Sequence, residues 1–137
     1  FSQVQKTVGA TQRVRELLRE PEETPADAPV VTAGLPARLR GDVAFEHVGF
    51  RYPSRPEMDV LNDVTLAARP GERIALVGPS GAGKSTLTAL LLRFYDPERG
   101  RVCFDGRNAR DYPLAWLRGQ MALVPQDVLL FGGTIAE

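Results

Sequence analysis

The nine residues GPSGAGKST, from Gly78 to Thr86, constrain the fold of this chain more than any other segment. Three glycines stand ahead of a lysine and two hydroxyl residues, between the apolar run Ile74–Val77 and a leucine-rich stretch that starts at Leu87. Because glycine reaches backbone conformations that other residues avoid, successive N–H groups can turn toward one point. The pattern predicts a tight loop between a strand and a helix, with its amides converging on an anion.

The side chains of this loop indicate that the anion is a polyphosphate. Lys84 offers a compact charge to the outer phosphates, Ser85 offers a hydroxyl to a Mg²⁺ ion that bridges them, and Thr86 can donate to an inner phosphate. Of the 17 basic residues only Lys6 and Lys84 are lysines, and the bulkier arginine fork does not replace an ammonium in a tight loop. A glycine-rich turn that merely caps a helix is the alternative, and the flanking strand and helix make it the weaker one.

Apolar residues alternate along the chain ahead of this loop. Val43 and Phe45 share one phase, whereas Val48, Phe50 and Tyr52 share the opposite phase. Alternation with a period of two is typical of a strand, and a one-residue slip turns every side chain to the other face. The change of phase therefore predicts a β-bulge within one strand, or two short strands.

Further strands are predicted on both sides of the loop. Residues 64–68 alternate as a strand, after which the turn Arg69–Glu72 reverses the chain. Ile74–Val77 and Met121–Val124 are continuous apolar runs, which predict strands buried on both faces. A shorter strand is expected over Val102–Phe104.

Two helices are expected in the second half of the chain. Pro113 could open a short helix that runs through Arg118. The other helix follows the glycine-rich loop and is closed by Asp96-Pro97. Its apolar residues recur at helical spacing, at Leu87, Leu90, Leu91 and Phe94.

The beginning of the chain differs from its middle. Residues 1–20 carry apolar side chains at helical spacing and predict an amphipathic helix that ends at Pro21. Residues 21–40 hold four of the eleven prolines, mixed with Glu, Asp, Ala and Thr, and predict an extended linker. The globular part is expected over residues 41–137.

Composition narrows the classes of function. The net charge is zero, from 17 basic and 17 acidic residues, so charge gives no argument for nucleic acid or an anionic membrane surface as a partner. Cys103 is the single cysteine, so no disulfide forms within the chain. No apolar run approaches the ~20 residues of a membrane span and no signal-peptide pattern is present, so we expect the chain as given to be soluble. His47, the only histidine, is interpreted as structural, and a zinc site or a protease mechanism is unsupported.

Gln126 and Tyr52 could each contact a bound ligand, and their positions leave two interpretations open for each. Gln126 follows the run Met121–Val124 and Pro125, so it would project from the carboxyl end of a strand, where ligands of open α/β sheets sit. From there it could reach the metal or the terminal phosphate, or it could be an ordinary loop residue. Tyr52 could stack on a flat base or shield a sheet edge.

Three segments together resemble the first half of the ATP-binding domain of an ABC transporter. They are VAFEHVGFRYPSRPEMDVLNDVTL, GERIALVGPSGAGKSTL and MALVPQDVLLFGGTIAE, and the match runs over residues 41–137. The opening segment FSQVQKTVGATQRVRELL resembles the cytoplasmic end of the last membrane helix in exporters that fuse membrane and ATPase domains. The resemblance implies an α/β fold, a P-loop NTPase-like sheet with an antiparallel β subdomain, incomplete in this chain.

The resemblance also implies roles for individual residues. Tyr52 matches the aromatic residue that stacks on adenine, and Gln126 matches the glutamine that touches Mg²⁺ and the attacking water. Lys84 and Gln126 would be catalytic, and Ser85 and Gln126 would contact the metal. ATP and Mg²⁺ are the implied ligands. The implied nucleotide-binding set is Tyr52, Gly78, Pro79, Ser80, Gly81, Ala82, Gly83, Lys84, Ser85 and Thr86.

The same resemblance implies partners and a cellular setting. In this family two ATP-binding domains face each other head to tail, with each ATP between the phosphate loop of one and the signature motif of the other. A transmembrane domain meets the loop that contains Gln126, which couples the nucleotide state to transport. The parent protein would be an integral membrane exporter driven by ATP hydrolysis, with this domain on the cytoplasmic face and no nucleic-acid partner.

Several features of the family are absent from these residues. They are the LSGGQ-like signature motif, the apolar strand that ends in Asp-Glu, and the switch histidine, all of which lie downstream of Glu137 in the family. The chain thus resembles the middle of a longer protein whose parallel strands would lack neighbours, and we expect it to bind nucleotide but to hydrolyse ATP poorly alone. The alternatives are a soluble ABC ATPase, a P-loop kinase with a lid and an acceptor pocket, and a nucleotide sensor without turnover.

Overall fold

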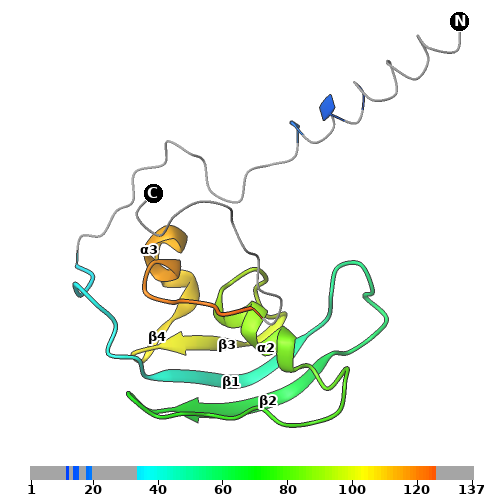
Figure 1. The fold of residues 1–137 in the computed structure, drawn as a ribbon. Helices are drawn as coiled ribbons and strands as arrows, with labels where there is room; N and C mark the ends of the chain where they lie inside the picture. Colours follow the sequence, from blue (N-terminus) through cyan, green and yellow to red (C-terminus); the bar gives the residue numbers. More distant parts are fainter. Residues whose placement is uncertain (1–11, 13, 16–17, 20–33, 126–137) are drawn as a thin grey trace, which may run out of the picture.

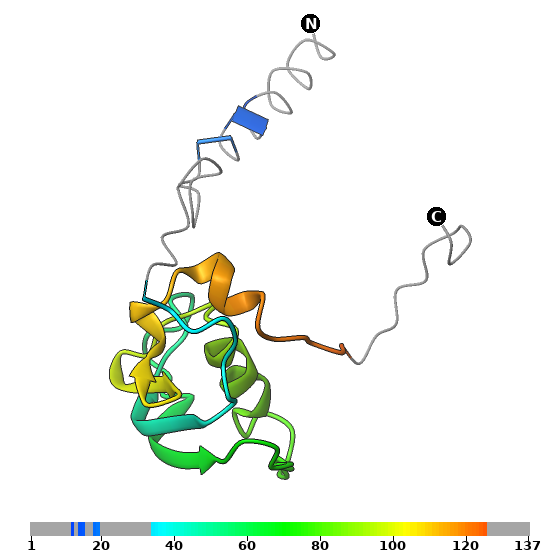
Figure 2. The ribbon, with the colours of Figure 1, turned by 90° about the vertical axis from the view of Figure 1, so that its left-hand side faces the viewer.

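The computed structural model describes residues 12, 14, 15, 18, 19 and 34–125. Within these residues an antiparallel sheet of four strands has the order β2-β1-β3-β4. Figures 1 and 2 show α2 packed beside the curved sheet and α3 next to the short strand β4. The elements are β1 (Val43–Phe50), β2 (Leu61–Ala68), α2 (Lys84–Leu91), β3 (Arg99–Phe104), β4 (Arg107–Asn108), the 3-10 helix η1 (Ala109–Asp111) and α3 (Leu114–Arg118).

One hydrophobic core joins the sheet to both helices. The strands contribute Phe45, Val48, Phe50, Leu61, Val102 and Phe104, α2 contributes Leu87 and Leu90, and α3 contributes Leu117. Leu90 and Leu117 are 1% and 0% exposed. Because α2 directly follows the glycine-rich loop, the burial of its leucines fixes where that loop ends.

The predicted change of phase in β1 is confirmed as a bulge. Phe45 pairs with Leu66 and Val48 pairs with Val64, so β1 uses one residue more than β2 over this interval. His47 has a φ of 51°. The extra residue lets Phe45 and Val48 both point into the core, although they are three positions apart.

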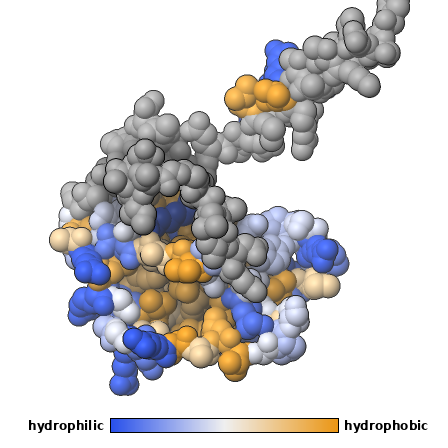
Figure 3. Space-filling model, in the orientation of Figure 1, coloured by the Kyte–Doolittle hydropathy of each residue, from blue (hydrophilic) through white to orange (hydrophobic). Residues whose placement is uncertain are grey.

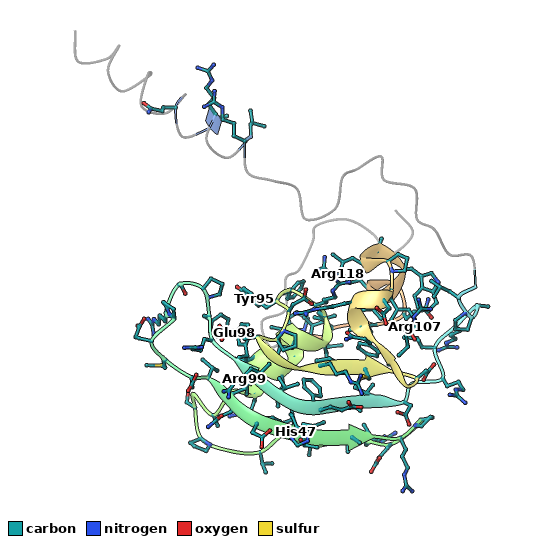
Figure 4. All side chains as sticks on the ribbon, turned by 180° about the vertical axis from the view of Figure 1, so that it is seen from behind. His47, Tyr95, Glu98, Arg99, Arg107 and Arg118 are labelled. Carbon is teal, nitrogen blue, oxygen red and sulfur yellow. The ribbon has the colours of Figure 1, made fainter. Side chains whose placement is uncertain are left out.

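A second irregularity, on β2, compensates for the first. Val48 pairs with Val64 and Phe50 pairs with Leu61, so here β2 uses the extra residue, and Asp63 has a φ of 53°. The side chains at the two irregular positions meet, with His47 Nδ1 2.8 Å from Asp63 Oδ1. Figure 4 shows His47 beside the β1–β2 strand pair, away from Arg118 and α3. This position agrees with the interpretation of His47 as structural.

Several predicted elements appear where the sequence placed them. The predicted strand over residues 64–68 lies within β2, and the strand over Val102–Phe104 is the second half of β3. In the turn after β2, the Glu72 N–H donates to the Arg69 carbonyl oxygen at 3.0 Å. The short helix after Pro113 is α3.

The prediction of strands over Ile74–Val77 and Met121–Val124 is wrong for this structure, because neither run belongs to a strand of the described sheet. Val77 is 88% exposed and Val124 is 90% exposed. A strand is buried on both faces only when other strands pair with its backbone and helices cover it, and within residues 34–125 neither run has such neighbours. Figure 3 shows apolar side chains gathered in the middle of one face, with polar ones around them.

Helix α2 is shorter than the predicted helix, which included Phe94 and was closed by Asp96-Pro97. It ends at Leu91, and Arg93 takes a φ of 54° that no helix continues. Phe94 therefore lies outside the helix and is 54% exposed instead of buried. The guanidinium of Arg118 lies 5.1 Å from the centre of the Phe94 ring, and its Nε donates to the Leu92 carbonyl oxygen at 2.9 Å.

The predicted helix over residues 1–20 and the linker over 21–40 fall largely outside the described residues, and both stay predictions. Where the chain is described again, Leu35 and Leu39 pack against the core. The Asp105 carboxylate then accepts hydrogen bonds from three successive backbone N–H groups, those of residues 40–42, at 2.7, 3.1 and 3.0 Å. Across the described residues, no helix has the length and apolar character needed to cross a membrane.

Candidate phosphate-binding site

The predicted glycine-rich loop is present and leads directly into α2. Its three glycines all have positive φ, at 149° for Gly78, 83° for Gly81 and 82° for Gly83. Gly83 is the N-cap of α2, and no side chain caps this end of the helix. The helix therefore directs the positive end of its dipole toward the loop without a side-chain cap between them, which suits an anion.

The side chain of Lys84 folds back over this loop. Its ammonium donates hydrogen bonds to the carbonyl oxygens of Gly78 at 2.8 Å and Pro79 at 2.7 Å. Both carbonyls lie at the start of the loop, whereas Lys84 is the first residue of α2. The positive charge is thus held over the start of the glycine-rich loop.

The end of the loop packs tightly on the beginning of β2. A Cβ atom on Gly83 would lie 2.7 Å from Leu61 Cδ2 and 3.3 Å from the Val60 carbonyl oxygen. Leu61 belongs to the core. Gly83 is therefore required both for its positive φ and for this close approach, which ties the loop to the sheet.

Tyr52, two residues after the end of β1, lies directly beside the glycine-rich loop, although 25 residues separate it from Gly78 in the sequence. Its hydroxyl oxygen is 3.0 Å from Thr86 Oγ1. Its ring contacts the Phe50 and Tyr95 rings edge to face, with centroids 5.0 and 5.3 Å apart. These contacts hold one aromatic ring next to the first turn of α2.

A pocket of about 560 Å³ lies between the glycine-rich loop and the segment after β1. Seven of the predicted site residues line it, and three others, Gly78, Pro79 and Ala82, belong to the loop but not to the pocket wall. The seven are Tyr52, Ser80, Gly81, Gly83, Lys84, Ser85 and Thr86. Gln126 lies outside the described residues, so its predicted role stays a prediction.

The sequence reasoning missed three residues of the pocket wall, Arg55, Met58 and Val60. They follow Tyr52 in a segment that folds back on itself, because the Arg55 N–H donates to the Tyr52 carbonyl oxygen at 2.9 Å and the Met58 N–H donates to the Arg55 carbonyl oxygen at 3.2 Å. The one available signal was their nearness to Tyr52 in the sequence, since no motif marks them.

The donor groups fit a magnesium ion that is held mainly by phosphates. Among the described residues there is no group of three or more His, Cys, Asp or Glu side chains that could hold a metal by itself. Mg²⁺ at phosphate sites usually takes one or two protein ligands together with phosphate oxygens and water. The exposed hydroxyl of Ser85 in the pocket wall could supply one such ligand.

A glycine loop closed by a lysine at the start of a helix, beside an aromatic ring, is typical of a phosphate-loop nucleotide-binding domain. The family model described as ABC transporter matches residues 61–137, which is more than half of the chain. The chain belongs to the ABC transporter family, and the resemblance predicted from its motifs is confirmed.

Individual relatives are consistent with a nucleotide-binding domain of the exporter type. ABC transporter B family member 1 of Arabidopsis thaliana is 48% identical over 93% of this chain, which is 10% of that protein. The ATP-dependent lipid A-core flippase of Alkalilimnicola ehrlichii is 43% identical over 99% of this chain and 22% of that protein. The solved structure of a bacterial Atm1-family ABC exporter with ATP bound is 34% identical, with a TM-score of 0.68, over 93% of this chain and 21% of that one. The chain thus spans between 10% and 22% of the length of these relatives.

Proposed function

We propose that this chain holds ATP with Mg²⁺ in the pocket between Tyr52 and the phosphate loop, as the nucleotide-binding part of an ABC exporter. The observation that carries the proposal is the position of the Lys84 ammonium, on the carbonyl oxygens of Gly78 and Pro79 in a pocket that Tyr52 also lines. A cation within a loop of backbone amides suits a polyphosphate, and a neighbouring aromatic ring suits a flat base.

The base of the nucleotide stacks on Tyr52 in this proposal. Stacking of a base on an aromatic side chain stabilises nucleic-acid complexes by about 1–3 kcal/mol. Met58 and Val60 add apolar surface to the same pocket, and Arg55 adds a cation. The edge-to-face contacts with Phe50 and Tyr95 keep the Tyr52 ring in place before the nucleotide arrives, which lowers the entropy lost on binding.

The phosphates lie over residues 78–86. Backbone N–H groups of the loop and the first turn of α2 donate to them, Lys84 neutralises the outer phosphates, and Thr86 donates to an inner one. Ser85 and Gln126 are the side chains that would hold Mg²⁺, which when bound neutralises charge on the phosphates. Gln126 would also orient a water molecule for in-line attack on the terminal phosphoryl group.

At the level of the whole protein, we propose a membrane exporter on whose cytoplasmic face this domain hydrolyses ATP. Its partners would be a second ABC ATP-binding domain, arranged head to tail, and a transmembrane domain. Supporting this, relatives that match almost the whole chain are named as a flippase and an exporter and are several times longer. The family assignment sets aside the P-loop kinase, and these names favour an exporter over a soluble ABC ATPase.

Titration calorimetry tests the proposed binding. We expect ATP and ADP each to bind one site on the chain in the presence of Mg²⁺, and we expect ATP to bind more weakly when a chelator removes the metal. Thermal unfolding with the same ligands is the second measurement, since a ligand that binds the folded state raises its midpoint. If neither nucleotide released heat or raised the midpoint, the proposal would be wrong.

A further inference from the structure

Two hydroxyl groups meet at the boundary between the base and phosphate halves of the pocket. The Tyr52 hydroxyl oxygen lies 3.0 Å from Thr86 Oγ1, and both residues line the pocket. Thr86 is only 4% exposed, so little water competes for its hydroxyl. This contact joins the segment after β1 to the first turn of α2, and it ends at the Thr86 hydroxyl, to which the proposal assigns an inner phosphate.

The same helix contains a threonine whose hydroxyl behaves differently. Thr88 Oγ1 donates to the Lys84 carbonyl oxygen at 3.5 Å, which is the usual bond of a helical threonine to the preceding turn. A threonine hydroxyl has one proton, and a bond of this kind uses it. The hydroxyl of Thr86 is instead held by Tyr52.

The chemistry of a phosphate fixes the direction of the hydrogen bonds once a ligand is present. Ionised phosphate oxygens only accept, so Thr86 must donate its proton to the phosphate. The Tyr52 hydroxyl must then donate to a lone pair of Thr86 Oγ1, because a hydroxyl offers two acceptor positions beside its proton. Hydrogen bonds linked in this order strengthen one another.

We propose that Tyr52 positions the Thr86 hydroxyl for the phosphate chain, in addition to stacking on the base. The inference rests on the proposed function, because it assigns a second task to a residue of the same pocket. Its ring faces the base, whereas its hydroxyl acts on the phosphates through Thr86. The affinity for a phosphate chain without any base should therefore depend on the Tyr52 hydroxyl.

Inorganic triphosphate with Mg²⁺ is the probe that separates the two tasks, because it has no base to stack. Tyr52→Phe keeps the ring and removes the hydroxyl. We expect this variant of the intact protein to bind both triphosphate and ATP about three- to tenfold more weakly, the effect of one lost hydrogen bond. A tyrosine that only stacks would leave the triphosphate affinity of Tyr52→Phe unchanged, and that result would overturn the inference.

A double-variant cycle with Thr86→Val identifies the partner of the hydroxyl. We expect Tyr52→Phe to have little further effect in the Thr86→Val background, since the hydroxyl then has nothing to position. Thr86→Ser, which keeps a hydroxyl, should restore most of the affinity, and Thr88→Val is the matched control expected to change nothing. Additive losses in the double variant would contradict the inference.

The outcomes distinguish the inference from the function on which it rests. If the unaltered protein bound neither ATP nor triphosphate, the proposed function would fail and the inference with it. If the unaltered protein bound both, and Tyr52→Phe bound triphosphate equally well, only the inference would fail. Thermal unfolding midpoints of all variants show whether a loss of affinity comes from a loss of folded protein.

Discussion

The Lys84 ammonium donates to the carbonyl oxygen of Gly78 at 2.8 Å, so the first residue of α2 closes the loop upon its own beginning. We predict that Lys84→Ala lowers the affinity for MgATP about tenfold to a hundredfold, because a hydrogen bond to a charged group contributes about 1.5–3 kcal/mol. Titration calorimetry measures this affinity. The fold should persist, with a change in unfolding free energy of about 0.5 kcal/mol or less, since the side chain reaches the pocket and not the core.

Two further variants serve as controls for the lysine. Lys84→Arg keeps the charge, but we expect it to bind MgATP nearly as poorly as Lys84→Ala, because the planar fork does not fit where the ammonium lies. Lys6→Ala removes the only other lysine of the chain and should leave affinity unchanged. An unaltered affinity in Lys84→Ala would refute the role assigned to this residue.

Gly83 and Gly81 form a matched pair for the packing of the loop. Both have a φ near 83°, but a Cβ on Gly83 would lie 2.7 Å from Leu61 Cδ2, whereas a Cβ on Gly81 would meet nothing within 4 Å. We predict that Gly81→Ala costs about 1–2 kcal/mol of unfolding free energy, from the backbone alone. Gly83→Ala should cost about 1–3 kcal/mol more, because the loop must also move away from the core.

Urea unfolding of the two glycine variants gives both numbers, with Gly71→Ala as a further reference for an uncrowded glycine at positive φ. The difference between Gly83→Ala and Gly81→Ala isolates the contact with Leu61. Equal losses in the two variants would show that this contact does not tie the loop to the sheet.

Local features of the site could be predicted because each depends on a few neighbouring residues. The glycines of the loop were identified by the conformations they permit, and all three adopt positive φ. The reversed phase of Val48 predicted a β-bulge or two short strands. The structure has a bulge between Phe45 and Val48, which lets both side chains face the same core.

Features that depend on distant residues could not be predicted in the same way. An apolar run such as Ile74–Val77 indicates that a segment can be buried, but burial as a strand requires paired strands on both sides. Within the described residues no strand of the sheet pairs with this run. The hydrogen bond between the Tyr52 and Thr86 hydroxyls joins residues 34 positions apart, and no periodicity or motif encodes such a pair.

The exposed valines at the ends of the two apolar runs should affect solubility more than stability. Val77 is 88% exposed and Val124 is 90% exposed, whereas Val48 in the core is 0% exposed. We predict that Val77→Ser and Val124→Ser change the unfolding free energy by about 0.5 kcal/mol or less and reduce self-association. Val48→Ala, the contrasting variant, should cost about 2 kcal/mol.

Light scattering at increasing protein concentration measures the self-association of these variants, and urea unfolding measures their stability. The two serine variants should scatter less than the unaltered chain at equal concentration. A stability loss in Val77→Ser as large as that in Val48→Ala would show that Val77 is packed against other residues.

Cys103 should react with thiol reagents only when the chain unfolds. It is 4% exposed in β3, and burial raises the pKa of its thiol above the ordinary 9.0. We predict alkylation on the order of a hundredfold slower in the folded chain than in denaturant, because a stability of only about 3 kcal/mol already protects to that extent. Comparable rates in both conditions would contradict the burial of this thiol.

The same shift predicts how stability changes at alkaline pH. With its pKa raised, the folded thiol keeps its proton at pH values where the unfolded thiol has lost it. The unfolded state therefore binds fewer protons, and the unfolding free energy should fall as the pH rises above 9.0. In urea unfolding at a series of pH values, the unfolding free energy of Cys103→Ala should decline less steeply above pH 9.0. An identical decline in the variant would show that other groups cause the loss of stability.

Hydrolysis by the isolated 137 residues should be slow even when ATP is bound as proposed. The pocket wall that the structure describes contains no aspartate or glutamate that could act as a general base, and a positioned base contributes about 10²–10⁴ to a rate. We therefore expect phosphate release at least a hundredfold below that of a complete exporter carrying the same domain. Lys84→Ala, measured at an ATP concentration near the dissociation constant of the unaltered chain, serves as the control for contaminating ATPase, because it should weaken the proposed binding while the chain stays folded. A rate equal to that of the complete exporter, and abolished by Lys84→Ala, would mean that this chain supplies its own base.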